Sequence, residues 1–409
     1  MLQYHSGPIS DVVHSSNSNA CVTLGSDGQL KLWDYINRRE VFNKKFIGSG
    51  LCIDWMPFSP LSGGRVLAAG FDNGIVRVIG IGSDSFSVLN AFKAHDSPVT
   101  KIKYSPDCEF LVSAAKDGTV FFFELTHDNL HQYTPLCMVQ LPAQVNDMCW
   151  DGQAKKVLFG CNNGYVYELT KPKKEDIDNA ESYLVELPMR EWRIKMMEFQ
   201  MKKNQKKDPE ELEKRKRMRL RGELPKEEEE EEEDWDPEPI RACHYIEDGS
   251  DRFVVASQGL FLGYYYVCSF DKERPLKAVE TPKSLIEYLG RSPTGDMVVS
   301  GFANGAYYLR WTDNQEIALE IKMHDGHRGG VRCVRFNPKE NYVVSVGNDG
   351  LMFVYNINRD GIKAAATESD SSSATMMYET EGVERLNLEE PLKMKEEEFD
   401  IRHAEQLSI

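Results

Sequence analysis

The sequence has no long hydrophobic run. Its longest apolar stretch, residues 261–268, includes three tyrosines and is about half the length of the roughly 20 residues that a membrane-spanning helix needs. Residues 1–11 contain His5, Gly7 and Pro8 in place of the positively charged start and apolar stretch of a secretory signal. We therefore expect neither a membrane-spanning helix nor a signal peptide.

The sequence also lacks paired cysteines, because none of its nine cysteines forms a C-x-x-C motif and all occur singly. Such scattered cysteines in apolar segments are typical of reduced, buried thiols in a cytosolic protein. A G-K-S/T phosphate loop and a complete dinucleotide-binding glycine motif are absent as well. His127 and His131 lie four residues apart in a polar connector without a third ligand. We expect no disulfide, no metal site and no cofactor.

The formal net charge of −16 is concentrated in two segments. Residues 171–239 have 17 Lys/Arg and 22 Asp/Glu, a net of −5, and residues 360–409 have 5 and 13, a net of −8. This leaves a net of −3 for the rest of the chain. A nearly neutral main body argues against a nucleic-acid-binding domain.

A strand–turn–strand pattern returns at a period of about forty residues, which is typical of propeller blades. The clearest copies are residues 21–34, 110–125 and 342–357, weaker copies turn at residues 72–74, 162–164 and 303–305, and a seventh lies at residues 253–267. Asp-Gly and Asn-Gly pairs suit two-residue hairpin turns because both residues tolerate positive φ. We expect an all-β, seven-bladed β-propeller, with blades 1–4 in residues 1–170 and blades 5–7 in residues 240–359.

Three of the repeats resemble the WD-repeat family, whose best blades contain a buried tetrad of His, Ser or Thr, Asp and Trp. The three sets are His5, Thr23, Asp27 and Trp33; His95, Ser113, Asp117 and Phe123; and His327, Ser345, Asp349 and Tyr355. The His and the hydroxyl residue are 18 positions apart in every set, and the hydroxyl residue and the Asp are 4 apart. Phe123 and Tyr355 replace the Trp. The second, fourth, fifth and sixth repeats lack the tetrad His and Asp, so only their strands and turns assign them.

The tetrad residues have a structural role by the chemistry of their groups. A buried carboxylate needs hydrogen-bond donors, which an imidazole N–H and turn amides supply, and the hydroxyl extends the network to the indole. A hydrolytic His/Ser/Asp triad is the alternative interpretation. The set occurs three times, however, and no G-x-S-x-G nucleophile elbow accompanies it. We expect a binding scaffold without catalytic residues rather than an enzyme.

Residues 171–239 depart from the strand pattern and predict a charged helical insertion between the fourth and fifth blades. One helix is expected to start at Met189 and to continue through Trp192. A second is expected to start at Pro209, with Asp208 as its N-cap. The insertion would interrupt the ring without belonging to a blade.

The insertion contains a basic stretch, residues 202–221, with ten basic and four acidic side chains and a net charge of +6. Two interpretations of this stretch remain open. The first is contact with an acidic partner such as a tubulin surface, or nuclear localisation. The second is a solvated helix balanced by the seven consecutive glutamates at residues 227–233. The residues proposed for partner binding are Lys214, Arg215, Lys216 and Arg217.

The two ends of the chain leave further expectations. Residues 360–409 are acidic and low in aromatic residues, so we expect a mostly disordered tail, with the start of a coiled coil as an open alternative. The last blade of a WD-repeat propeller normally takes its outer strand from the N-terminal side, and only residues 1–4 precede His5. Either these residues close the ring, or the chain is a fragment of a longer protein.

A narrower resemblance is to the second propeller of the large axonemal WD-repeat proteins. It rests on the charged insertion within the ring, on Trp235 at the end of an acidic run, and on residues 327–332 and 396–401. The resemblance implies a component of the tether that links an inner-arm dynein to the doublet microtubule, needed for the beating of cilia and sperm flagella. Implied partners are a WD-repeat tether partner, an inner-arm dynein heavy chain and tubulin, with no nucleic acid and no membrane. The alternative is a nuclear or cytosolic adaptor in ribosome assembly or ubiquitin ligation.

Overall fold

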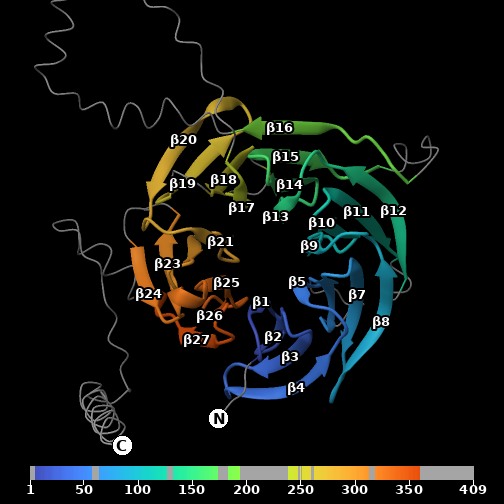
Figure 1. Cartoon of the computed structure of the whole chain (residues 1–409), viewed down its shortest axis with the longest axis vertical. Helices are drawn as coiled ribbons and strands as arrows, with labels where there is room; N and C mark the ends of the chain where they lie inside the picture. Colours follow the sequence, from blue (N-terminus) through green and yellow to red (C-terminus); the bar gives the residue numbers. More distant parts are fainter. Residues whose placement is uncertain are drawn as a thin grey trace, which may run out of the picture. The chain divides into compact units, whose positions relative to one another are not determined.

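The computed structural model describes residues 5–57, 64–126, 132–173, 183–193, 238–246, 249, 251–258, 262–312 and 318–359. In these residues, strands β1 to β27 form seven antiparallel sheets that stand side by side around a central axis (Figure 1). Six sheets have four strands and the seventh has three. The prediction of an all-β, seven-bladed propeller is confirmed. No helix in the described part of the chain is long and apolar enough to cross a membrane.

Each blade is built from four strands, or three in the seventh, that run outward from the axis in chain order. The strands of the first four blades are β1 (Ile9–His14), β2 (Ala20–Gly25), β3 (Gln29–Asp34), β4 (Arg39–Lys45), β5 (Gly50–Trp55), β6 (Val66–Phe71), β7 (Ile75–Ile81), β8 (Phe86–Lys93), β9 (Val99–Tyr104), β10 (Phe110–Ala115), β11 (Thr119–Leu125), β12 (Tyr133–Gln140), β13 (Val145–Trp150), β14 (Lys156–Cys161), β15 (Tyr165–Thr170) and β16 (Met189–Arg193). Those of the last three are β17 (Ile240–Tyr245), β18 (Arg252–Ser257), β19 (Tyr264–Ser269), β20 (Lys272–Glu280), β21 (Ile286–Arg291), β22 (Met297–Phe302), β23 (Ala306–Trp311), β24 (Ala318–Lys322), β25 (Val331–Phe336), β26 (Tyr342–Gly347) and β27 (Met352–Asn356). A 3-10 turn, η1 (Gly326–Arg328), precedes β25.

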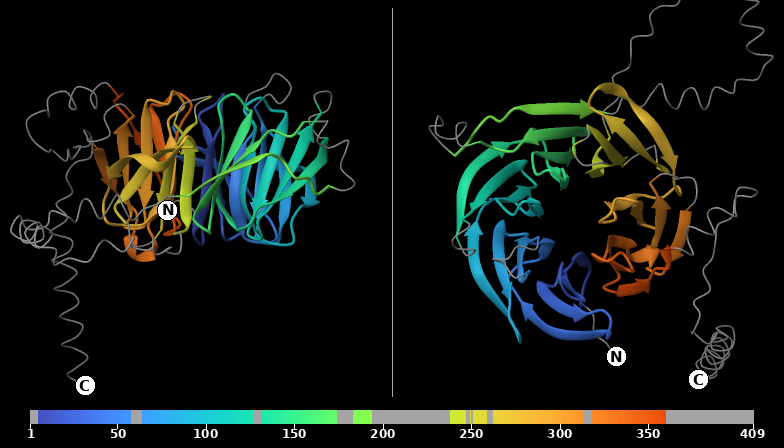
Figure 2. Two further views of the ribbon diagram at one scale, coloured as in Figure 1. Left: turned by 90° about the horizontal axis from the view of Figure 1, so that it is seen from above. Right: turned by 180° about the vertical axis from the view of Figure 1, so that it is seen from behind.

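The hydrophobic core lies between the blades rather than within one layer. Seven clusters of buried apolar side chains fill the seven spaces between neighbouring blades, one cluster to each space. Alternation along each strand sends successive side chains to the two faces of its sheet, so every blade packs against both neighbours. Figure 2 shows the sheets packed face to face around the ring.

Every innermost strand has a bulge after its first residue. In the first blade the pairing of β1 with β2 shifts between Ile9 and Asp11, and the same shift recurs in all seven blades. A bulge re-aims the side chains that follow it. The third and fifth residues of each innermost strand follow this bulge and share one face of the strand. We call these two places in each blade the junction positions.

The hairpin turns between the second and third strands follow the predicted chemistry. Gly28 and Gly118 have φ values of +73° and +84°, a region that L side chains rarely adopt. A Cβ at Gly28 would also lie 2.6 Å from the carbonyl oxygen of Phe46. Glycine is therefore needed at this turn for its backbone conformation and for the close approach of the neighbouring loop.

The first and last blades close the ring through side chains. An apolar cluster that includes Trp33 and Val344 fills this space, and the Arg335 guanidinium lies 3.2 Å from the Asp11 carboxylate. Nearby, the Asn337 amide donates to the Tyr35 hydroxyl over 3.2 Å. Residues 1–4 lie outside the described residues, so their predicted part in closing the ring stays a prediction.

The prediction of a helix starting at Met189 is wrong. Residues Met189–Arg193 form β16, the outermost strand of the fourth blade, in register with β15 so that Trp192 lies opposite Val166. Met, Arg and Glu favour a helix by intrinsic propensity, but pairing with β15 and burial of Trp192 override that preference. The fourth blade therefore extends into residues 171–239, and the expected second helix, the basic stretch and residues 360–409 lie outside the described residues.

Candidate functional site: buried tetrads and a charged central axis

The first blade brings its four predicted tetrad residues together. The Nε2 atom of His5 lies 2.8 Å from Thr23 Oγ1, and its Nδ1 atom lies 3.1 Å from Asp27 Oδ1. The Trp33 indole donates to the same Thr23 oxygen over 2.8 Å. A Cβ at Gly25 would lie 2.4 Å from His5 Nδ1, so this strand end must be glycine to leave room for the imidazole.

The protonation of this tetrad follows from its partners. Burial lowers the pKa of His5, opposed in part by Asp27, so the imidazole is neutral near pH 7. The pKa of Asp27 is lowered although burial acts to raise it, because the Gln29 amide, His5 and the Ser6 amide donate hydrogen bonds to it. An ionised carboxylate accepts only, so His5 donates from Nδ1 to Asp27, and its Nε2 accepts from the Thr23 hydroxyl.

The third blade has the same arrangement with one residue interposed. His95 Nε2 lies 2.8 Å from Ser113 Oγ, but His95 Nδ1 lies 2.6 Å from Thr119 Oγ1, and the Thr119 hydroxyl donates to Asp117 over 2.7 Å. Thr119 thus connects the imidazole to the predicted carboxylate. Burial lowers the pKa of His95 to about 4. Phe123 is buried at the Trp position and has no N–H to donate to Ser113, so the network ends at the hydroxyl.

In the seventh blade the predicted histidine is wrong. His324, not His327, contacts the tetrad: its Nδ1 lies 3.0 Å from Asp349 Oδ2 and its Nε2 lies 2.9 Å from Ser345 Oγ. His327 is exposed, within the 3-10 turn η1. That turn lengthens the loop before β25, so the spacing of 18 residues no longer leads back to the imidazole. Tyr355 lies at the Trp position, with its ring 5.5 Å from that of Tyr307.

A signal in the sequence distinguished the two histidines. His95 is followed by Asp96, and His324 is followed by Asp325, whereas His327 is followed by arginine. The Asp325 amide donates to Asp349 over 3.1 Å, as the Ser6 amide donates to Asp27 in the first blade. The place of the histidine at the start of the loop before β25 identifies His324, whereas a fixed gap of 18 residues from Ser345 does not.

The tetrad hydroxyls are placed for cohesion rather than for attack on a substrate. Thr23, Ser113 and Ser345 are each 0% exposed. A nucleophile must reach its substrate, and in each of these blades the hydroxyl is covered by the strands on both sides. The geometry supports a structural network repeated in three blades.

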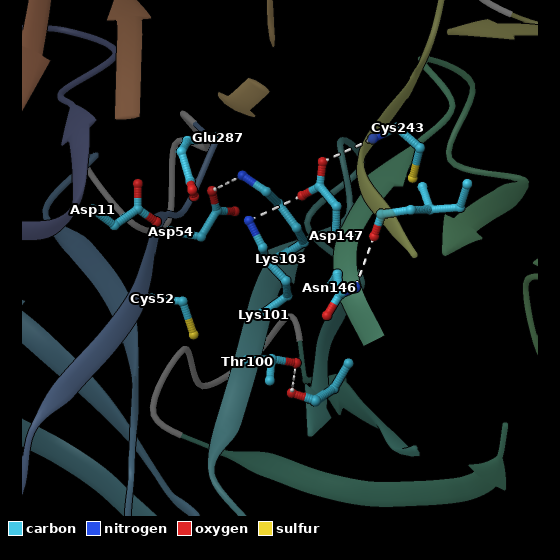
Figure 3. Close-up of polar contacts among 12 residues, drawn as sticks. Asp11, Cys52, Asp54, Thr100, Lys101, Lys103, Asn146, Asp147, Cys243 and Glu287 are labelled. Atoms are coloured by element: carbon cyan, nitrogen blue, oxygen red, sulfur yellow. Dashed lines mark hydrogen bonds and ion pairs between the residues drawn. The ribbon is translucent and has the colours of Figure 1, made fainter. Parts of the chain in front are cut away.

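The junction positions around the axis carry a ring of paired charges (Figure 3). Lys101 lies 3.0 Å from Asp147, and Lys103 lies 2.7 Å from Asp54. With the Arg335–Asp11 pair, three carboxylates and three cations are paired beside the axis. Equal numbers of each sign leave no surplus charge for a polyanion.

The same carboxylates also bind the backbone of the following blade. Asp11 accepts from the amide of Ile53 over 3.2 Å, and Asp147 accepts from the amide of Cys243 over 3.0 Å. Asp54 likewise accepts from the amide of Tyr104, the last residue of β9, over 2.9 Å. Figure 3 shows the Asp147 carboxylate between Lys101 and Cys243. Each carboxylate therefore joins two blades, through a cation on one oxygen and a backbone amide on the other.

The pKa values along the axis agree with this pairing. Burial acts to raise the pKa of Asp11, but Arg335, Lys101 and Lys103 lower it overall. Burial acts to lower the pKa of Lys101, but Asp147 and Asp11 raise it overall. Asp11 and Lys101 are therefore charged near neutral pH and attract their partners across the blades.

The junctions after the fifth and sixth blades differ, because their positions hold Ala242 and His244, and Tyr288 and Gly290, none of which is charged near neutral pH. His244 is 6% exposed, and neither of its ring nitrogens has a hydrogen-bond partner among the described residues. Burial lowers the pKa of His244 to about 4. The imidazole is therefore neutral and unsatisfied, at a cost in stability.

No metal or thiol chemistry is supported by the described residues. They contain no group of three or more His, Cys, Asp or Glu side chains able to hold a metal ion. All nine cysteines are thiols, and burial raises the pKa of Cys149 to about 11 and that of Cys161 to about 12. Thiols with raised pKa values are poor nucleophiles and poor metal ligands at neutral pH. His127 and His131 lie outside the described residues.

The comparison with protein families matches the tetrad-bearing blades. The model described as "WD domain, G-beta repeat" matches residues 1–34, 86–124 and 319–356. These three segments contain the three sets of His, hydroxyl residue and Asp. In these three segments the chain is similar to WD-repeat proteins, and its seven sheets form a β-propeller.

Among curated proteins, the chain is similar to cilia- and flagella-associated protein 44 from three organisms. It is 24% identical to that of Mus musculus over 494 aligned residues, which cover 100% of this chain and 26% of the mouse protein. It is 24% identical to that of Chlamydomonas reinhardtii, over 45% of this chain and 11% of that protein. These matches confirm, at low identity, the resemblance to large axonemal WD-repeat proteins that the sequence predicted.

A shorter similarity involves WD-repeat proteins of other names. WD repeat-containing protein 91 of Danio rerio is 41% identical over 69 residues, or 17% of this chain and 9% of that protein. The chain spans about a quarter of the mouse relative and smaller shares of the others. These names indicate a structural or interaction protein rather than a known enzyme family.

Proposed function

We propose that the chain is a non-enzymatic scaffold for protein–protein interaction in the axoneme of cilia or flagella. The observation that carries this proposal is the match of the whole chain to the mouse protein, supported by relatives of the same name in Trypanosoma brucei brucei and Chlamydomonas reinhardtii. These names support localisation to the cilium or flagellum. The fold agrees, because a rigid ring of seven blades offers wide faces for binding while its buried polar residues serve its own cohesion.

The finer proposal is that the chain contributes to the tether linking an inner-arm dynein to the doublet microtubule, and that ciliary and sperm-flagellar motility needs it. Its partners would be a WD-repeat tether protein, an inner-arm dynein heavy chain and tubulin. The basic cluster Lys214, Arg215, Lys216 and Arg217 is the proposed contact for an acidic partner surface. The chain corresponds to about a quarter of the mouse relative.

The test is made in ciliated cells of the source organism, with the protein tagged at its own locus. We expect the tagged protein in detergent-resistant axonemes, and cross-links from residues 202–221 to tubulin or a dynein heavy chain by mass spectrometry. Loss of the protein is expected to reduce beat frequency with axonemes still assembled. Recovery in the nucleus or cytosol, with none in axonemes, would reject the axonemal function.

The second candidate is a nuclear or cytosolic WD-repeat adaptor, in ribosome assembly or as a substrate receptor of a ubiquitin ligase. Two observations favour it: the basic cluster that begins at Lys214 has the composition of a nuclear localisation signal, and proteins named WD repeat-containing protein 90 and 91 also match. Replacing the four cluster residues by alanine distinguishes the candidates. The adaptor predicts loss of nuclear signal, and the axonemal scaffold predicts loss of cross-links to its acidic partner without relocation to the nucleus.

A further inference from the structure

The junction between the fourth and fifth blades has an unusual covalent connection. Residues 194–239 separate β16 from β17, whereas the other outer-to-inner connections are as short as residues 46–49 and no longer than residues 323–330. A long connection restrains its two ends less than a short one does. The alignment of the fourth and fifth blades must therefore depend on side chains that cross the junction.

The outermost strand of the fourth blade reaches onto the fifth. Trp192 is 5% exposed, its indole N–H donates to the carbonyl oxygen of Lys272 over 2.7 Å, and its ring lies 5.3 Å from that of Phe253 in an edge-to-face contact. Lys272 begins β20 and Phe253 lies on β18. One aromatic side chain of β16 thus contacts two strands of the next blade.

A buried carboxylate lies beneath this contact. Glu168 on β15 is 2% exposed and accepts from the Tyr245 hydroxyl of the fifth blade over 2.9 Å. Its other oxygen lies 3.2 Å from Arg190 and 3.5 Å from Lys156. Both cations also contact Asp251 of the fifth blade, at 3.0 and 2.8 Å. Two carboxylates and two cations are therefore shared across the junction, and their charges balance.

The inner side of the same junction is joined as well. Asp147 accepts from the Cys243 amide, and the Asn146 side chain donates to the Ile240 carbonyl over 2.7 Å (Figure 3). The fourth and fifth blades are thus joined beside the axis and at the rim. The next junction offers a contrast, because Ala242 and His244 face the sixth blade there, and its covalent connection, residues 281–285, is short.

We propose that the contacts between the fourth and fifth blades form a permanent lock, which keeps the ring closed when the chain between β16 and β17 is interrupted or pulled by a partner. In this assignment the junction from the fifth to the sixth blade relies on its apolar cluster and its short covalent connection instead. A partner could then pull on the connection between β16 and β17 without separating the fourth blade from the fifth. This property is independent of the cell compartment.

The test compares two full-length proteins, each with one protease recognition sequence inserted. In the first the sequence follows Gly222, and in the second it lies within residues 281–285. Each cleaved protein would consist of two fragments. In both proteins the fragments meet at the junction between the seventh and first blades. Their second contact is the cut junction, between the fourth and fifth blades in one protein and between the fifth and sixth in the other. Cleavage is verified on a denaturing gel, and the association of the fragments is measured by native mass spectrometry and thermal melting.

We expect the fragments cut after Gly222 to remain one complex that melts within a few degrees of the intact protein, and those cut at residues 281–285 to dissociate or melt at least about 10 °C lower. Equal behaviour of the two proteins, or the reverse order, would overturn the proposal. A second variant identifies the residues responsible. Trp192→Ala with Tyr245→Phe is expected to separate the fragments cut after Gly222.

A milder variant covers the case in which that pair of changes prevents folding. Trp192→Phe removes the indole N–H but keeps a ring against Phe253, and it is expected to raise the rate of fragment dissociation about tenfold. An unchanged rate would contradict the proposed lock. Val41→Ala, on the exposed rim of β4, is the control and is expected to leave the rate unchanged.

Discussion

The Nε2 atom of His324 lies 2.9 Å from the Ser345 hydroxyl, across 21 residues of sequence, whereas 18 residues separate the equivalent pair in the first and third blades. The longer loop keeps the network and changes only the spacing. A fixed interval in the sequence is therefore a weaker guide than the place where the chain enters a blade. The rest of the tetrad, from Ser345 to Asp349, keeps its usual spacing.

His324→Ala is expected to lower the free energy of unfolding by about 2 to 3 kcal/mol, because Asp349 and Ser345 each lose a buried hydrogen-bond partner. His327→Ala is the matched control, since His327 is exposed three residues away and is expected to leave stability unchanged. Urea unfolding followed by tryptophan fluorescence measures both variants. A larger loss for His327→Ala would show that the seventh tetrad is assigned to the wrong histidine.

Acid is expected to destabilise the ring through His244. Its pKa in the folded protein is about 4, below the ordinary value of 6.5, so the unfolded chain binds the proton first. The stability held by the neutral imidazole is fully present above pH 6.5 and is lost as the pH falls toward 4, with a loss of about 2 kcal/mol by pH 5.

His244→Phe removes the titrating group, so the difference in unfolding free energy between pH 7 and pH 5 is expected to shrink by that amount relative to the unaltered protein. His327→Ala again serves as the control, with no change in the pH dependence. If the two variants depend on pH in the same way, His244 does not carry the acid sensitivity.

Asp147→Ala is expected to cost about 2 kcal/mol of stability, because it removes the acceptor of both Lys101 and the Cys243 amide. Asp96→Ala provides the comparison. Asp96 is fully exposed, and its ion pair with Lys93 is long at 3.8 Å. Its removal is therefore expected to leave the melting temperature unchanged. Similar melting temperatures for the two variants would argue that the charges beside the axis do not join the blades.

Ala242→Asp would place a carboxylate at the junction position that Asp11 and Asp147 occupy in other blades. Beside His244, this charge is expected to raise the pKa of the imidazole from about 4 toward its ordinary value. Nuclear magnetic resonance titration of the histidine ring measures the shift, and Ala242→Asn gives the same shape without the charge. A shift of equal size in both variants would exclude the carboxylate as its cause.

The repeat, and with it the fold, could be predicted from the amino-acid sequence. Asp27-Gly28 and its counterparts place a hairpin turn in six of the blades, because few residue pairs adopt the backbone angles of such a turn. This requirement is local. Alternating apolar residues then specify which strand faces pack against neighbours. Thr23 and Trp33 could be assigned to the first tetrad because both lie within one short hairpin of fixed register.

The side-chain contacts between blades could not be predicted from the sequence. The sequence predicted a helix for residues 189–193, but pairing with β15 and the contact of Trp192 with the fifth blade make them a strand. His324 rather than His327 was selected by the path of a loop. The ion pair of Arg335 with Asp11, 324 residues apart, exists only because the ring closes. Contacts of this kind depend on the geometry of seven packed sheets, which local propensity does not encode.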